Sequence, residues 1–262
     1  MRARNSGLFA CALMILGLVG SGCATEPLYE EDDLIGGVMR AAYVQVAPAR
    51  DPVVANPGDP MWRQYWFPIE NRDRDTNPST LAVTRFLDVQ PGMSVADLGA
   101  GGGYHTFRLA TAVGPAGHVL ATDRDPRMSE KIAWEARARA VNNITVLRSS
   151  RGDLGLNGRT VDVLLINDAP VLATCDRAMQ RSVVRQIADA VRPGGRFVYF
   201  GETPESSPQS GCDMPSEAEV IALTSPYFEV TAAQQFEKPA PERTWRGFAL
   251  QLRRLDAEAS GG

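Results

Sequence analysis

One glycine-rich segment has residue types and a spacing that could support chemistry. Asp97 lies near the end of the short β-type run Ser94–Leu98, and glycines follow at positions 99, 101 and 103 before a helical pattern begins. A strand that turns sharply into a helix needs backbone angles that glycine adopts cheaply. Without Cβ atoms there, and with free N–H groups at the helix start, a ligand can lie against the backbone. We therefore consider the segment a candidate ligand-binding turn, the alternative being a tight turn without a ligand.

The spacing of the glycines narrows the kind of ligand. Dinucleotide-binding enzymes favour G-x-G-x-x-G, but the sixth position here is Tyr104. Asp123 ends the next expected strand, 20 residues after Gly103, where a carboxylate can accept hydrogen bonds from both hydroxyls of a ribose. The alternative role for Asp123 is to cap the helix that follows Pro126. Together these residues favour a ligand that carries a nucleoside.

A second group of polar residues follows the run Val161–Ile166, which is apolar apart from Asp162 and is typical of a central strand covered on both faces. Asn167 and Asp168 come directly after it. The carboxyl edge of an open α/β sheet is where ligands bind, so both side chains are candidates for contact with a ligand. The alternative is that they only cap the following loop.

The elements that must position these residues alternate between strand and helix. Alternation through five strands implies a parallel sheet with right-handed crossovers, and two final strands with a short connection imply an antiparallel hairpin. We therefore expect an α/β fold with a doubly wound, mostly parallel seven-stranded sheet and a C-terminal antiparallel hairpin. The expected strands are 94–98, 118–122, 144–147, 161–166, 196–200, 228–236 and 245–252, and the expected helices are 78–87, 106–113, 127–141, 175–191 and 216–223.

The glycine-rich segment resembles motif I of class I S-adenosylmethionine-dependent methyltransferases, often written D/E-x-G-x-G-x-G. Arg192-Pro193-Gly194-Gly195 is similar to the L-K-P-G-G turn before the fifth strand of that family. The resemblance covers residues 77–252, and its segments 91–101 and 113–119 look like a group of predicted bacterial methyltransferases, some with export signals. It implies a Rossmann-like fold with S-adenosylmethionine as cofactor.

The resemblance also implies which residues contact the cofactor. Asp97 would orient the cationic methionine part, and Asp123 would bind the ribose. The family places an acid near the adenine amino group in the loop after the third strand, where this chain offers Asp153 or, alternatively, Ser150, and where Ser149-Ser150 replaces the usual Gly-Asp. The complete implied set is Asp97, Gly99, Ala100, Gly101, Gly103, Tyr104, Asp123, Arg124, Asp153, Asn167 and Asp168.

The implied reaction is transfer of a methyl group to an unidentified small-molecule or envelope acceptor. No residue is assigned as catalytic, because a general base is needed only for a protonated acceptor. His105 follows the glycine turn and could approach a ligand or simply pack. The His and Cys residues are too dispersed for a metal site. The alternative function is a catalytically inactive, nucleoside-binding envelope lipoprotein on the same scaffold.

The N-terminus has the pattern of an export signal. Arg2 and Arg4 precede the apolar run 8–19, which is too short to span a bilayer but fits the apolar part of a secretory signal. Small residues and then Cys23 follow, which resembles a bacterial lipoprotein signal with Cys23 as the lipidated residue; Ala24 favours the periplasmic side of the outer membrane. The alternatives are ordinary cleavage nearby, giving a soluble periplasmic protein, or an uncleaved anchor. The expected segments are a signal peptide at 1–22, a flexible tether at 23–60, the methyltransferase domain at 61–254 and a tail at 255–262.

Net charge and cysteine content indicate which binding partners and which cysteine pairing to expect. The formal net charge is −4, and removal of the leader leaves 25 basic and 31 acidic side chains. A mildly acidic body does not favour nucleic acid, so we expect a small-molecule acceptor, membrane contact through the lipid anchor, and a monomer or weak dimer. With Cys11 in the leader and Cys23 acylated, Cys175 and Cys212 remain as one disulfide or as two free thiols.

Overall fold

The computed structural model describes residues 72–204, 214–239 and 244–256. The predicted signal peptide, the lipidation site Cys23, the tether and the tail from 257 therefore lie outside the described residues, as does Cys212. Cys175 is disulfide-bonded. In the part of the chain that is described, no helix is both long enough and apolar enough to cross a membrane.

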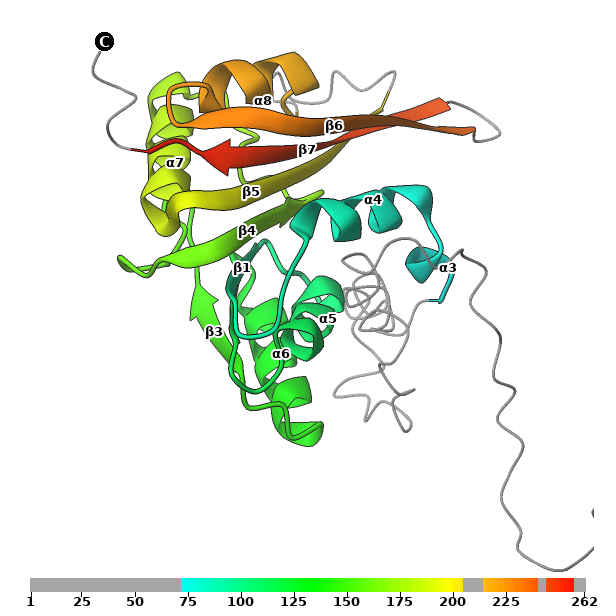
Figure 1. Ribbon diagram of the computed structural model, residues 1–262, viewed down its shortest axis with the longest axis vertical. Helices are drawn as coiled ribbons and strands as arrows, with labels where there is room; N and C mark the ends of the chain where they lie inside the picture. Colours follow the sequence, from blue (N-terminus) through cyan, green and yellow to red (C-terminus); the bar gives the residue numbers. More distant parts are fainter. Residues whose placement is uncertain (1–71, 205–213, 240–243, 257–262) are drawn as a thin grey trace, which may run out of the picture. The chain divides into compact units, whose positions relative to one another are not determined.

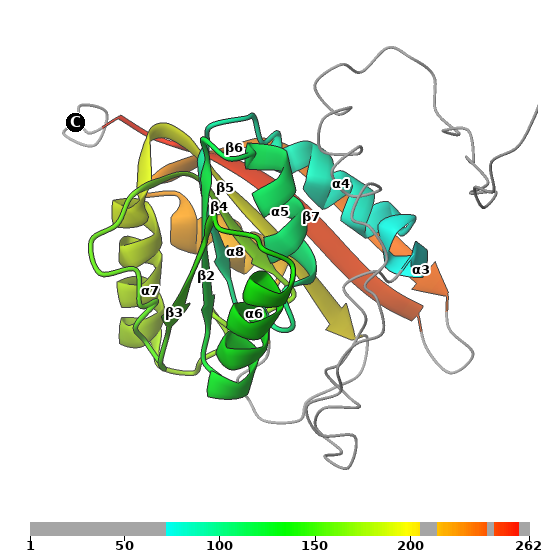
Figure 2. The same cartoon turned by 90° about the horizontal axis from the view of Figure 1, so that it is seen from below.

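A single seven-stranded sheet forms the centre of the described part, with helices on both of its faces (Figures 1 and 2). The strands are β1 (Ser94–Leu98), β2 (His118–Asp123), β3 (Ile144–Arg148), β4 (Val161–Asn167), β5 (Val191–Pro204), β6 (Phe228–Pro239) and β7 (Thr244–Arg254). The helices are α3 (Arg72–Asp75), α4 (Pro78–Leu87), α5 (Tyr104–Val113), α6 (Pro126–Ala138), α7 (Arg177–Ala190) and α8 (Glu217–Thr224).

The strand order is β3-β2-β1-β4-β5-β7-β6. The five strands β1 to β5 are parallel, and β7 pairs antiparallel with both β5 and β6. This arrangement confirms the predicted fold class. The chain moves outward from β1 to β3 and then returns to place β4 on the other side of β1. The carboxyl ends of β1 and β4 therefore meet at the point where the winding reverses, which is where open α/β sheets bind ligands.

Two apolar layers bury both faces of the sheet. Along β4, Val163 and Leu165 pack toward α4 and α5, whereas Leu164 and Ile166 pack toward α7 and α8. All four side chains are fully buried. Because both faces of β4 are covered, its central residues from Val163 to Ile166 are all apolar instead of alternating with polar ones.

The helix starts follow local sequence signals. Asn77 caps α4 by accepting a hydrogen bond from the Ser79 backbone N–H at 3.0 Å, and Pro78 is the first helical residue, as predicted. Ser216 and Glu219 form the predicted capping box of α8. Helix α5 starts two residues earlier than predicted, at Tyr104, because the preceding Gly103 adopts a positive φ of 93° and ends the turn.

The three C-terminal strands are longer than predicted. β4 ends at Asn167, opposite Phe200, but β5 continues to Pro204 through pairing with β7 alone. The predicted turn at residues 193–195 also lies within β5, where the pairing with β4 shifts between Val161 and Val163. Strands β5, β7 and β6 therefore extend past the carboxyl end of β4 (Figure 1).

Candidate cofactor site

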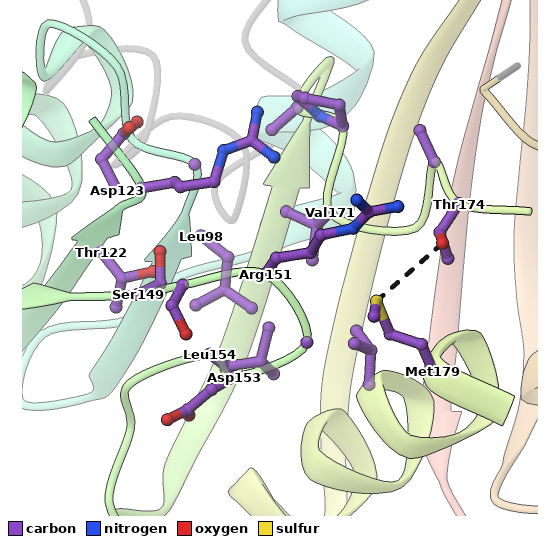
Figure 3. A pocket seen from close by; sticks show the side chains of 18 of the residues that line it. Leu98, Thr122, Asp123, Ser149, Arg151, Asp153, Leu154, Val171, Thr174 and Met179 are labelled. Atoms are coloured by element: carbon purple, nitrogen blue, oxygen red, sulfur yellow. Dashed lines mark hydrogen bonds between the residues drawn. The ribbon is translucent and has the colours of Figure 1, made fainter. Parts of the chain in front are cut away.

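A cavity of about 500 Å³ lies at the carboxyl edge of the sheet, beside the point where the winding reverses (Figure 3). This volume is within the range of about 300–1,000 Å³ that is typical of small-molecule sites. The cavity is bounded by the ends of β1 and β2, the β3–β4 loop and the β4–α7 loop. Five of the predicted residues line it, namely Gly99, Asp123, Arg124, Asp153 and Asp168.

Asp123 connects the ends of β1 and β2. Its carboxylate accepts one hydrogen bond from the Gly101 backbone N–H and one from the Asp125 backbone N–H, both at 2.8 Å. Asp125, not Asp123, is the N-cap of α6, so the capping alternative for Asp123 does not apply. A carboxylate oxygen can accept more than one hydrogen bond, and Asp123 lines the cavity. It therefore retains the capacity to bind a ribose.

The backbone donors of the glycine turn are used differently from the sequence-based expectation. The N–H groups of Gly99 and Ala100 both donate to the Thr122 carbonyl, at 2.8 and 2.9 Å, and that of Gly101 donates to Asp123. These donors fix the turn against the end of β2 instead of facing a ligand. The turn is thus rigidly held before any ligand arrives.

The three glycines of the motif serve different purposes, although all have positive φ. A Cβ on Gly99 would lie 2.3 Å from the Cβ of Ala169, and a Cβ on Gly103 would lie 2.9 Å from the Phe107 ring. Close packing therefore requires glycine at both positions. A Cβ on Gly101 would meet no heavy atom within 4 Å. Only Gly101 leaves the open space that a cofactor lying against the turn would need.

Asp97 lies behind the glycine turn and does not line the cavity. Its side chain is buried, and its carboxylate accepts a hydrogen bond from the Thr106 hydroxyl at 2.6 Å. Burial raises the pKa of Asp97 to about 6; Asp123 adds to this effect, and Thr106 and Arg74 oppose it. The charge of this buried carboxylate is only partly offset by its neighbours, so a cation nearby would stabilise it. The α-ammonium group of a methionine moiety is such a cation.

A buried cluster that the sequence did not reveal fixes α3 against α5. Arg108 is fully buried and forms an ion pair with Asp75 at 2.5 Å, and the Tyr104 hydroxyl donates to the same carboxylate at 2.5 Å. The guanidinium carbons of Arg108 and Arg74 lie 3.9 and 4.1 Å from the centre of the Tyr104 ring. Tyr104 thus lies in this cluster and not in the cavity wall. The charge of Arg74 acts to lower the pKa of Asp97, Asp168 and His105. Arg74 therefore lies near the carboxyl edge of the sheet.

His105 is buried beside this cluster. Its ring packs edge-on against Tyr104, with 4.9 Å between ring centres. Burial, together with the charges of Arg74 and Arg108, lowers the pKa of His105 well below its usual value. The imidazole is therefore neutral at physiological pH.

The β3–β4 loop forms the wall where the family places adenine. The Asp153 carboxylate accepts a hydrogen bond from the Gly155 backbone N–H at 2.9 Å, and the Ser150 and Asp153 backbones pair with each other. Both residues line the cavity, so the two alternatives for the adenine contact remain. Arg151, which no sequence motif indicated, extends across the cavity toward the β4–α7 loop (Figure 3).

Asn167 and Asp168, the two polar residues at the end of β4, differ in their position relative to the cavity. Asn167 pairs with Phe200 as the last strand residue and does not line the cavity, whereas Asp168 does. Asp168 adopts a positive φ of 50°, and its N–H donates to the Phe200 carbonyl at 2.9 Å. Although part of Asp168 is exposed to solvent, partial burial and the nearby Glu202 raise its pKa to about 6.

Within the described ranges, no group of three His, Cys, Asp or Glu residues could hold a metal ion.

Comparison with known proteins finds similarity to methyltransferases. Residues 95–195 match a family described as "Methyltransferase domain". An arsenite methyltransferase of Halobacterium salinarum is 30% identical over 123 residues, which are 47% of this chain and 30% of that protein. A protein-L-isoaspartate O-methyltransferase of Methanothrix thermoacetophila is 30% identical over 133 residues, which are 50% of this chain and 59% of that protein. The chain thus spans less than two thirds of the length of these relatives.

Solved structures agree on the fold. A SAM-dependent methyltransferase from Aquifex aeolicus superimposes with a TM-score of 0.53 at 18% identity, covering 72% of this chain and all of the other. The N-methyltransferase NodS from Bradyrhizobium japonicum, in complex with S-adenosylhomocysteine, gives a TM-score of 0.54 at 15% identity, covering 75% of this chain and 97% of NodS. Residues 95–195 are therefore similar to a methyltransferase domain, and the described part of the chain has the fold of these solved methyltransferases.

Proposed function

We propose that this protein transfers a methyl group from S-adenosylmethionine to a small-molecule or envelope acceptor. The observation that carries the proposal is the hydrogen bond from the Gly101 N–H to Asp123, whose side chain lines a cavity of suitable volume. It brings a carboxylate for ribose beside the open space over Gly101. When bound there, S-adenosylmethionine supplies an electrophilic methyl group on a sulfonium centre.

The residues around the cavity suit the separate parts of the cofactor. Leu98, Val171 and Met179 provide apolar surface for the adenine. Asp97, buried behind the turn, suits the α-ammonium group, and the nearby charge of Arg74 suits the α-carboxylate. The protein's task is then to align the methyl group with the acceptor and to exclude water.

We further propose that the protein acts as an exported lipoprotein on the periplasmic side of the outer membrane, anchored through Cys23. The order of basic residues, short apolar run, small residues and cysteine supports this location. The disulfide at Cys175 is consistent with an oxidising compartment. We propose Cys212 as its partner, no nucleic-acid partner, and a monomer or weak dimer.

A second candidate function is binding without catalysis. It is favoured by the altered adenine loop, where serines occupy the usual Gly-Asp positions and the Asp153 carboxylate is already bonded to Gly155. The protein would then retain a nucleoside ligand as a sensor or carrier. This alternative shares the cavity but requires no acceptor.

Titration calorimetry of the full chain with S-adenosylmethionine and S-adenosylhomocysteine tests the cofactor assignment. Asp123→Ala should weaken both affinities by about 1–3 kcal/mol because ribose hydrogen bonds are lost. Asp162→Ala is the matched control, since Asp162 accepts a hydrogen bond from the Ser94 N–H at the opposite edge of the sheet. Equal affinities for the wild type and Asp123→Ala would refute the ribose assignment.

Transfer of labelled methyl groups to envelope extracts then separates the two candidate functions. Cofactor binding with transfer supports the enzyme. Cofactor binding without transfer supports the non-catalytic alternative.

A further inference from the structure

Two carboxyl groups lie together where β4 ends and β5 continues. The Asp168 N–H donates to the Phe200 carbonyl, and the Glu202 backbone N–H hydrogen-bonds the Asp168 carboxylate. Asp168 thus caps the end of β4 from within the plane of the sheet, directly beside β5. The half-buried Glu202 adds its charge to the same place, as its effect on Asp168 shows.

The Tyr199 hydroxyl is a second, independent indication that the region around Asp168 and Glu202 is functional. Tyr199 is fully buried, and its hydroxyl has no hydrogen-bond partner among the described residues. The hydroxyl oxygen lies 3.3 Å from the position that a Cβ on Gly201 would occupy, so it reaches toward the end of β4. Burial raises the pKa of Tyr199, and the charge of Asp168 adds to this effect, so the two groups lie near each other. A buried hydroxyl without a partner is unfavourable for folding, so a functional role would explain why it is retained.

The backbone of Asp168 also points to function. Its φ of 50° is in the left-handed region, which an aspartate tolerates better than most residues but seldom adopts without cause. This conformation directs the chain from β4 into the loop that forms the cavity wall. Asp168 consequently lines the cavity that we propose for the methyl donor.

The negative charges of Asp168 and Glu202 favour some classes of methyl acceptor over others. Transfer of a methyl group to a neutral amine moves the positive charge from sulfur to nitrogen. Two carboxylates beside the nitrogen stabilise that developing charge. An anionic acceptor, such as a carboxylate, would instead be repelled by both groups. Arg74 supplies an opposing charge, but its influence on the pKa of Asp168 is smaller than that of Glu202. Arg124 and Arg151 line the same cavity but are not among the groups that shift the pKa of Asp168.

Building on the proposed methyltransferase function, we propose that the acceptor presents a neutral amine nitrogen to Asp168 and Glu202. The nitrogen lone pair forms the bond to the methyl carbon, and the methyl–sulfur bond breaks with its electron pair passing to sulfur. The proton released from nitrogen passes to the Asp168 carboxylate and then to solvent. Asp168 is the catalytic residue of this step, and Tyr199 is a positioning residue that donates to the Asp168 carboxylate as it turns toward the acceptor.

The ionisation of Asp168 suits this role. Its pKa of about 6 results first from burial and then from Glu202, offset by the Glu202 backbone N–H and by Arg74. Asp168 is therefore ionised at neutral pH but is a stronger base than an ordinary aspartate.

The first experiment identifies the labelled atom. The full chain is incubated with S-[methyl-³H]adenosylmethionine and an envelope extract, and the product is treated with base and passed over a cation exchanger. Label that is stable to base and retained as a cation supports an amine acceptor. Label released as volatile methanol, or held on a neutral ether or thioether, overturns the amine proposal but leaves the methyltransferase function standing. Calorimetry without cofactor binding overturns the methyltransferase function itself, and binding without any labelled product overturns both.

The second experiment assigns the residues. Asp168→Asn should lower kcat/KM by about 100-fold while its affinity for S-adenosylhomocysteine stays within about threefold, which is less than the loss of one hydrogen bond to a charged group. Asp162→Asn, at the other end of β4, is the control and should alter neither quantity. If Asp168→Asn weakened S-adenosylhomocysteine binding as much as it slowed transfer, Asp168 would be a cofactor ligand and the assignment would be wrong.

Tyr199→Phe provides a readout that a purely structural role would not change. Donation from the hydroxyl favours the ionised form of Asp168, so its removal should shift the acidic limb of the pH–rate profile to higher pH. An unchanged limb would overturn the role of Tyr199.

Discussion

Replacement of Asp97 by asparagine should reveal how much the ionised Asp97 carboxylate lowers the free energy of unfolding. Asp97 is only 2% exposed, and its pKa is raised from 3.8 to about 6. This difference corresponds to about 3 kcal/mol between the protonated and ionised forms. Between these two pH values the folded state binds more protons than the unfolded state, so the free energy of unfolding falls as the pH rises. The contribution of Asp97 is fully present below pH 3.8 and is lost as the pH passes 6.

Asparagine does not titrate, so Asp97→Asn should lack this loss. Its buried amide introduces a destabilisation of about 1–3 kcal/mol, because one donor loses water, but that term does not depend on pH. The difference in unfolding free energy, variant minus wild type, should therefore increase by about 3 kcal/mol from about pH 3.5 to neutral pH. This change is an upper bound, because neighbouring charges relax when Asp97 ionises.

Urea denaturation of both proteins, followed by tryptophan fluorescence at a series of pH values, measures this difference. Saturating S-adenosylhomocysteine should stabilise the wild type at neutral pH more than the variant, because its ammonium group compensates the buried carboxylate. A difference that stays constant with pH, or that decreases, would refute the reasoning about Asp97.

Three further predictions concern the turn, the buried cluster and the anchor. Gly101→Val should abolish cofactor binding in calorimetry, whereas Gly92→Val, which also has a positive φ (87°, against 53° at Gly101) and equally open surroundings at the other end of β1, should bind normally; binding by both variants would count against the site. Arg108→Met should lower the free energy of unfolding in urea by about 3–5 kcal/mol, because the Asp75 carboxylate loses its cationic partner and keeps the Tyr104 hydroxyl; a loss under about 1 kcal/mol, as for exposed pairs, would contradict this. Cys23→Ser should abolish metabolic labelling with radioactive palmitate, and persistent labelling would overturn the anchor.

The sequence predicted those features that depend on local pattern. The alternation of strand and helix, the Asn77–Pro78 helix start and the capping box at Ser216 all follow from short-range rules. The turn from β1 is likewise visible as a run of glycines after an apolar strand. The fold class therefore follows from local pattern alone.

The features that the sequence did not reveal depend on contacts between distant residues. Asp75 and Arg108 are 33 positions apart and belong to no recurring motif, so their ion pair has no local signature. The requirement for Gly99 comes from Ala169 across the turn, and the length of β5 comes from pairing with β7. Each of these results from the tertiary fold, which local pattern does not encode.

The most direct test of the central claim is a crystal structure of the full chain with S-adenosylhomocysteine. The predicted result is a nucleoside in the cavity between β1 and β4, with both ribose hydroxyls donating to Asp123 and the methionine part over Gly101. S-adenosylhomocysteine bound elsewhere, or a ribose that does not contact Asp123, would contradict the account.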